Sequence, residues 1–467
     1  MCFRSLTLTG IILAYQAIAY SQETNTPSTS PQIPQKTSYL SGFIRGGLYG
    51  GIDKDGDDKP YIPSAFADFG LKAEVGNGLN FKAYADLRFR YGVEFQEPVS
   101  YVDLKEAWVR VNGRKWDLTA GQRIIKWGRA DFTHPTSNLS PQNMISRSPD
   151  REDMDMGNIL ASFNWYPSRA IRLEADLVPF YRSSVLIIDP VPLPENVTIT
   201  QINSLISDQK LLSYGLKADF SLRGIDMGLS WFDGYDPMPG IALSSFNIDL
   251  ASPAPIPVIG METKPYKTRV AGFDFESSIG SLGLRGEAAW AVPYLSSDTS
   301  EYVPLPEIIW VAGLEWSSGI WRIEMEYNGK YVDNYTPVET PPLIGTAPDY
   351  SMLGQLMSMP GFDLESFVRD QVGAFNRLYN YQIEKVYHAA GIRVECDLLY
   401  GKLFPSLFSM YNFTSRDLLV IPEIRYKPSD GLAITFGAEL FSGKDGSLYD
   451  IVDGFMNNIY ISFRADF

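Results

Sequence analysis

The sequence predicts an all-β protein, a transmembrane antiparallel up-and-down β-barrel of about 18 strands, with about 16 strands as the alternative. Three observations predict this fold. Segments of alternating apolar and polar residues recur along most of the chain, and the connections between them alternate between tight turns and long loops. The chain also ends in an alternating segment that closes on an aromatic residue, Phe467.

The first 38 residues precede the strand pattern. Residues 1–21 are typical of a signal peptide, because Arg4 precedes an apolar stretch and Ala17 and Ala19 form a small-x-small cleavage site. Residues 22–38 are rich in Ser, Thr, Pro and Gln, which is typical of a flexible leader. We therefore expect an exported chain, a periplasmic N-terminus and a barrel in the cell outer membrane over residues 39–467.

Residues 81–90 show the clearest alternation. Every second residue from Phe81 to Phe89 is apolar, and the residues between them are mostly charged. A period of two predicts a strand with one apolar face. Similar segments, each long enough to cross a bilayer as a tilted strand, are expected at 39–51, 61–75, 79–94, 100–112, 116–128, 158–167, 171–182, 210–222, 225–236, 266–279, 282–295, 307–318, 321–337, 384–399, 402–415, 417–428, 431–442 and 457–467.

The connections indicate a membrane barrel rather than a soluble sandwich. Gly, Asn, Asp and Ser mark tight turns, for example at 76–78, 112–114, 280–281 and 429–431. The intervening connections are often long, as at 129–157, 183–209, 237–265 and 338–383. Short periplasmic turns and long external loops are typical of outer-membrane barrels. Closure leaves no unpaired strand edge in the lipid.

The composition excludes several classes of function. The chain of 467 residues has 55 acidic and 40 basic residues, a net charge of −15, which disfavours nucleic acid as a partner. Cleavage of the signal peptide would remove Cys2 and leave Cys396 alone, so no disulfide is expected. We predict no cofactor and no metal site. Aromatic residues make up 13% of the chain, as membrane-interface girdles require.

If the apolar faces point to lipid, the polar faces line a lumen wide enough for water. We expect the charged residues there to select solutes, with the alternative that they only pair with one another and solvate the wall. The candidate lumen-lining residues are Lys82, Asp86, Arg88, Arg90, Glu106, Arg110, Arg172, Glu174, Arg285, Glu287, Arg322, Glu324, Arg393, Glu395, Glu423 and Arg425.

The fifth predicted strand and its loop, residues 121–141, form the most specific motif. Trp127 is suited to the membrane interface. Arg129 and Asp131 are expected to pair with each other or to offer opposite charges to a solute. The candidate pore residues of this motif are Gln122, Lys126, Trp127, Arg129, Asp131 and His134.

This motif, with Gly121-Gln122, Trp127-Gly128, an acidic residue and Leu139-Ser140-Pro141 in order, resembles outer-membrane porins of the alginate-export family and its uncharacterised relatives, in which the strand reads Gly-x-Gln. Segments 403–407, 411–413, 422–426 and 441–446 also resemble them. The resemblance implies an 18-stranded barrel with loops folded into the pore, and a lumen that selects the solute, an anionic polysaccharide being one type. His134 stands where Asn is usual, and the acidic balance argues against a strongly anionic solute.

We therefore expect a passive, selective channel for small polar or organic solutes, such as carbohydrates or carboxylates, and no enzyme. The alternatives are a closed structural or adhesive barrel, and a lipid hydrolase that uses His134 or His388 as its base. Expected partners are outer-membrane lipid and lipopolysaccharide, a small solute, and the barrel-assembly machinery, for which Phe467 would be the signal. The sequence does not predict the oligomeric state or the direction of transport.

Two loop segments remain. Residues 361–379 are expected to form a helix capped by Asp363, either plugging the pore or packing on the external rim. The acidic run 53–58 is similar to a calcium loop, but its Gly is out of register and Ser64 stands where the bidentate Glu belongs. We expect a solvated acidic loop there.

Overall fold

The computed structural model describes residues 37–52, 60–188, 193, 196–202, 211–249, 256–297, 300–338 and 361–467. The predicted signal peptide, the leader up to residue 36 and the acidic run 53–58 lie outside the described residues. The first strand begins at Thr37, so it takes in the last two residues that the sequence assigned to the leader.

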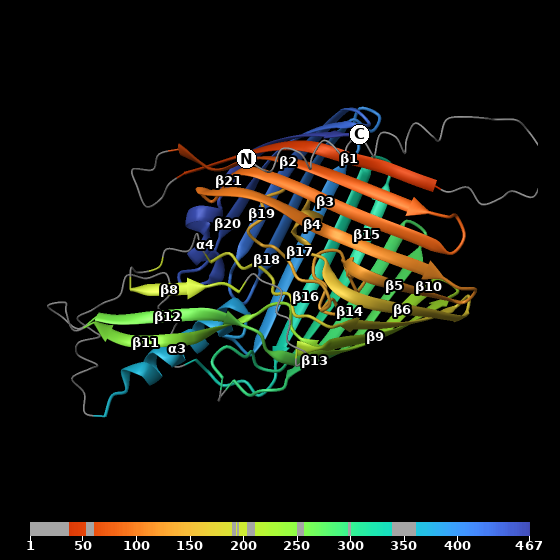
Figure 1. Cartoon of the computed structure of the whole chain (residues 1–467). Coiled ribbons are helices and arrows are strands. Elements are labelled where there is room, and N and C mark those ends of the chain that lie inside the picture. Colours follow the sequence, from red (N-terminus) through yellow and green to blue (C-terminus); the bar gives the residue numbers. More distant parts are fainter. Residues whose placement is uncertain are drawn as a thin grey trace, which may run out of the picture. The chain divides into compact units, whose positions relative to one another are not determined.

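Eighteen strands form one closed antiparallel sheet (Figure 1). β1 pairs with β2 on one edge and with the last strand, β21, on the other, which closes the barrel. In chain order the strands are β1 Thr37–Ile52, β2 Pro60–Gly76, β3 Phe81–Glu94, β4 Glu97–Asn112, β5 Trp116–Arg123, β6 Asn158–Ser168, β7 Ile171–Val178, β9 Ser213–Leu222, β10 Ile225–Tyr235, β13 Lys267–Ile279, β14 Leu282–Pro293, β15 Glu307–Ser318, β16 Trp321–Val332, β17 Val386–Cys396, β18 Leu403–Asn412, β19 Leu418–Ser429, β20 Leu432–Ser442 and β21 Asn458–Asp466.

Each of the predicted segments overlaps one of these strands, so the prediction of 18 strands is confirmed and the alternative of 16 is wrong. The largest differences concern β16, which was expected to continue to residue 337 but ends at Val332, and β5, which was expected to continue to residue 128 but ends at Arg123. The residues after Arg123 leave the wall, because they belong to a loop that turns into the lumen, as described below.

The two faces of the wall have opposite chemistry. On β1, Ile44 and Leu48 are 57% and 43% exposed, whereas Arg45 and Tyr49 on the other face are each 1% exposed. The same alternation recurs around the barrel, with apolar side chains outward and charged side chains inward. An apolar exterior is stable in lipid and not in water, so this wall is that of a membrane-spanning barrel.

A second, smaller sheet is built from the long loops. It contains β8 Val197–Thr200, β11 Gly240–Asp249 and β12 Ile256–Lys264, with β8 parallel to β12. The helix α3, Leu364–Tyr379, packs Val372 and Phe375 against Ile241 and Met261 of this sheet. Figure 1 shows this unit at one end of the barrel strands. The sequence did not predict the small sheet.

The predicted loop helix is confirmed as α3, and Asp363 accepts a hydrogen bond from the backbone N–H of Glu365 at 3.1 Å, as an N-cap does. Because α3 packs on the small sheet, it belongs to the rim at the long-loop end rather than to a plug. A second helix, α4 Leu448–Met456, begins at Ser447 and was not predicted. No helix in the described part of the chain is long and apolar enough to cross a membrane.

Candidate functional site: a loop across the lumen

Residues 124–157, here called the lumen loop, connect β5 to β6 and fold into the barrel. The loop turns sharply at Gly128, whose φ of +93° is a conformation that other residues rarely adopt. A Cβ atom at this position would lie 2.2 Å from Oε1 of Glu287, so the close approach also requires glycine. The loop contains a single turn of 3₁₀ helix, Arg151–Met154.

Two buried glutamates of the wall hold the first part of the loop. Glu287 on β14 accepts hydrogen bonds from the backbone N–H groups of Arg129 at 2.5 Å and Ala130 at 2.6 Å. Glu326 on β16 accepts three more, from the N–H groups of residues 131–133, at 2.9–3.0 Å. Several N–H groups that converge on one buried carboxyl group hold the backbone in a single position. These two side chains therefore fix the backbone of the loop against the wall.

Arg129 and Asp131 do not pair with each other. Arg129 Nε lies 2.7 Å from Oδ1 of Asp274, and Asp131 forms an ion pair with Arg285. Burial raises the pKa of Asp131, and the Arg285 guanidinium opposes this rise. Both residues therefore serve first as anchors of the loop rather than as free charges for a solute.

The second part of the loop is held by the opposite wall. Arg45 of β1, whose side chain is fully buried, donates to Asp68 at 2.6 Å and to Asp153 of the loop at 2.6 Å. Asp153 also pairs with Arg88 and accepts from Ser148 at 2.6 Å. Burial alone would raise the pKa of Asp153, but the two guanidinium groups and the Ser148 hydroxyl hold it well below its usual range.

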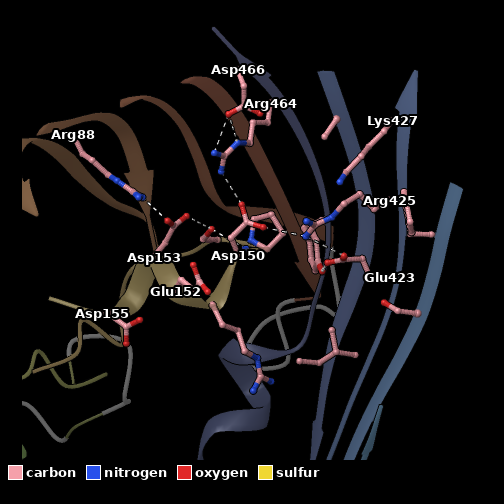
Figure 2. A pocket seen from close by; sticks show the side chains of 18 of the residues that line it. Arg88, Asp150, Glu152, Asp153, Asp155, Glu423, Arg425, Lys427, Arg464 and Asp466 are labelled. Carbon is pink, nitrogen blue, oxygen red and sulfur yellow. Dashed lines mark hydrogen bonds and ion pairs between the residues drawn. The ribbon is translucent and has the colours of Figure 1, made fainter. Parts of the chain in front are cut away.

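Asp150 attaches the lumen loop to the last strands of the barrel. Figure 2 shows its carboxylate between Arg425 of β19 and Arg464 of β21, each 3.0 Å away. Arg425 also pairs with Glu423 at 3.3 Å, and Arg464 with Asp466 at 3.0 Å. The lumen loop is therefore tied to strands on both sides of the barrel and divides the lumen into two parts.

A cavity lies on each side of the lumen loop. The larger has a volume of about 1090 Å³ and reaches the short-turn end of the barrel, near Lys72 and Asp430. The smaller has a volume of about 440 Å³ and faces the long-loop end, near Asp236 and Glu307. Lys126 and Asp155 line both cavities, and Lys126 Nζ lies 2.5 Å from Asp155 Oδ2. This ion pair is the boundary between the two cavities.

The predicted lumen residues face the lumen in different roles. Several form ion pairs or hydrogen bonds with neighbours in the wall, as the alternative interpretation expected: Lys82 with Glu74, Arg90 with Asp68, Arg110 with Thr119, Arg172 with Asp219 and Glu174, Arg322 with Glu315 and Glu324, and Arg393 with Glu324. The larger cavity is lined by predicted residues, some of which also form ion pairs, namely Asp86, Arg88, Glu106, Lys126, Arg393, Glu395, Glu423 and Arg425.

Two residues of the loop motif lie elsewhere than expected. Trp127 is not at the membrane interface, because it is 3% exposed and packs with Ile125 and Leu139 inside the lumen. Its Nε1 donates to Glu174 at 3.3 Å. Gln122 lies in β5 and donates to the backbone carbonyl of Leu104 in β4.

The two histidines have separate surroundings. His134 lies in the lumen with Nδ1 3.6 Å from Glu287, and it lines the smaller cavity. His388 lies on an exposed position of β17 and hydrogen-bonds Tyr327. The serines nearest to His134 in sequence, Ser137 and Ser140, accept hydrogen bonds from backbone N–H groups of residues 127 and 125. This arrangement is structural rather than that of a nucleophile and its base.

Among the residues of this site that sequence reasoning did not assign are Arg45, Asp150, Asp153 and Asp155. Arg45 could have been identified from the sequence, because the alternation along β1 places this charged residue on the same face as Phe43 and Tyr49. The three acids are in the charged part of the loop, where apolar and polar residues do not alternate. The sequence there does not indicate which side chains reach the wall. Their roles depend on contacts with strands far away in the sequence.

No family model matches the chain, and no curated protein matches its sequence. Solved structures match its fold. OccAB3 of Acinetobacter baumannii has 11% identity and a TM-score of 0.53, over 92% of this chain and 99% of that one. OccK2 (OpdF) of Pseudomonas aeruginosa, in complex with glucuronate, has 8% identity and a TM-score of 0.53, over 92% and 96%. OpdK of Pseudomonas aeruginosa, with vanillate, has 7% identity and a TM-score of 0.51, over 92% and 98%. The chain therefore has the barrel fold of these Occ and Opd outer-membrane proteins.

Proposed function

We propose that this protein is a passive outer-membrane channel for small polar organic solutes. One observation carries the proposal: the lumen loop leaves a charged cavity on each side of itself inside the barrel, and the two cavities meet at Lys126 and Asp155. A lumen that is lined by charge and narrowed by a fixed loop can admit small solutes and exclude large ones. The fold shared with the Occ and Opd proteins supports the same assignment.

The charges of the cavities indicate the class of solute. Nine basic and eleven acidic side chains line the larger cavity, so its opposite charges nearly balance. The acidic residues Asp155, Asp236 and Glu307 line the smaller cavity. Among the described residues that line it, Lys126 is the one that is permanently basic. This balance favours sugars, or solutes that carry one carboxylate beside hydroxyl groups, over a polyanion. We therefore apply the resemblance to alginate-export porins to the layout of the loop, but not to the identity of the solute.

In this proposal the N-terminus and the short turns are periplasmic, and the small sheet with α3 faces the exterior. The alternatives from the sequence have less support. A closed structural barrel would not need charged cavities on both sides of the loop. A lipid hydrolase would need a nucleophile beside His134 or His388, and the contacts of Ser137 and Ser140 do not provide one.

Solute uptake into proteoliposomes tests the proposal. The purified full chain is reconstituted, and the initial rates of uptake of glucose, glucuronate, vanillate and a large dextran are compared with those of empty vesicles. Faster uptake of at least one small solute, with the dextran excluded, is the expected result. If none of the small solutes enters faster than it enters empty vesicles, the channel assignment is wrong and the closed barrel takes its place.

A further inference from the structure

The outer wall of the barrel carries a group of charges on its lipid-facing side. Asp233 of β10, with Lys267 and Arg269 of β13, occupies outward positions at the long-loop end, where the other outward residues are mostly apolar or aromatic. Lys267 Nζ lies 2.8 Å from Asp233 Oδ1, and Arg269 Nε lies 3.5 Å from Asp233 Oδ2. We call these three residues with Tyr294 the outer basic cluster.

Tyr294 holds the cluster in place. Its hydroxyl group donates to Asp233 at 2.7 Å. Arg269 lies over its ring at 3.9 Å from the ring centre, and Lys267 at 4.5 Å. Two cations share one carboxylate and one aromatic ring, so the cluster has a net charge of +1 and its basic groups are oriented before any ligand binds. The side chain of Arg269 is nonetheless 48% exposed.

The strand register gives the depth of the cluster in the membrane. Asp233 and Arg269 lie opposite each other, and the next outward row toward the barrel centre contains Trp231, Ala271 and Trp290. The two tryptophans are 39% and 53% exposed, as expected for an interfacial girdle. The next outward row, one step further toward the barrel centre, is apolar. The cations therefore lie one row above the girdle, at the level of the lipid headgroups.

We propose that the outer basic cluster binds a phosphate group of lipopolysaccharide, the phosphorylated glycolipid of the outer leaflet. Lys267 and Arg269 follow the long loop 236–266, and long loops of such barrels face the exterior. A guanidinium and an ammonium group side by side match a phosphate monoester. The inference rests on the outer-membrane location proposed above, but it does not require that the lumen conducts.

Native mass spectrometry of the full chain in non-ionic detergent tests this site. The probes are bisphosphorylated lipid A, lipid A from which both phosphates have been removed, and phosphatidylglycerol. The wild type is expected to bind bisphosphorylated lipid A about tenfold more tightly than either other lipid, and Lys267→Ala with Arg269→Ala is expected to lose about tenfold in affinity. Asp233→Asn, which leaves the cations and removes the anion, is expected to bind about threefold more tightly.

The matched control is Arg169→Ala with Arg223→Ala, which removes two exposed cations from the short-turn end and should bind lipid A as the wild type does. Heat-modifiable migration in gels verifies that each variant is folded. Equal binding of phosphatidylglycerol, unchanged binding by the Lys267 and Arg269 variant, or an equal loss in the control would each overturn the proposal. Solute uptake by the same variants should remain at the wild-type rate, so failure here is distinguishable from failure of the channel assignment.

Discussion

Lys126 Nζ lies 2.5 Å from Asp155 Oδ2, and this ion pair joins the two ends of the lumen loop. Each of four cavities in the barrel is lined by Lys126, by Asp155 or by both. Lys126 belongs to the segment that enters the lumen and Asp155 to the segment that returns to the wall. The pair therefore lies where a solute would pass from one side of the loop to the other.

Removal of this pair should widen the passage. Lys126→Ala is expected to raise the single-channel conductance roughly twofold or more, because it removes the longer side chain from the boundary between the cavities. The exchange of charges in Lys126→Asp with Asp155→Lys should keep the conductance near that of the wild type. Arg369→Ala, which removes a cation from the external helix α3, serves as the control. Unchanged conductance in Lys126→Ala would place the narrowest point elsewhere.

The carboxylate of Glu287 should stabilise the loop. Glu287→Gln replaces an acceptor of two backbone N–H groups and the Thr136 hydroxyl, so we expect a loss of about 1–3 kcal/mol in the free energy of unfolding. Urea unfolding in detergent measures this loss, and channel recordings should show more frequent fluctuations of the current. Glu365→Gln on the surface of α3 is the control. Equal unfolding midpoints for both variants would show that the loop does not depend on Glu287.

The stability of the folded protein should depend on the protonation of Asp236, the first residue of the long loop after β10. Burial raises the pKa of Asp236 to about 6, from an ordinary value of 3.8. The folded state therefore favours the protonated carboxyl group. The contribution of this group to the free energy of unfolding is fully present below about pH 3.8 and is lost as the pH rises through about 6. We expect Asp236→Asn to melt at a higher temperature than the wild type at pH 7.5 and at the same temperature near pH 3.5. A difference that does not change with pH would contradict this assignment.

The aromatic residue Phe467 should act in assembly of the barrel, because it contacts β1 and β2. The Phe467 ring lies beside Phe69 at 6.1 Å between ring centres, and its backbone is paired with Gly42 of β1. We expect Phe467→Ala to lower the yield of folded, heat-modifiable barrel in the outer membrane. Phe463→Ala, at another exposed position of β21, should have a much smaller effect. Equal yields for the two variants would show that the terminal position has no special role.

The sequence predicted the barrel because strand alternation and turn residues are local properties. Residues 81–90 alternate without interruption, and β3 forms there with its charged face inward. The same local signals predicted α3 and its cap Asp363. The small sheet was not predictable in this way, because β8 is only four residues long and pairs with β12 across a long separation in the sequence.

The site was predicted only in part. Arg129 and Asp131 were identified as charges near the pore, but their partners Asp274 and Arg285 come from distant strands. Trp127 shows the limit most clearly: a Trp at a strand end is typical of the interface, yet here the chain has already turned inward and the ring is buried. Loop contacts of this kind depend on the closed barrel, and no periodicity encodes them.

Single-channel recording in a planar bilayer tests the central claim, that the lumen loop narrows an open channel. The wild type is compared with a variant in which residues 129–153 are replaced by a short Gly-Ser linker. We predict discrete current steps for the wild type and several times larger steps for the variant. A wild type without current steps, or steps of equal size in both proteins, would contradict the account.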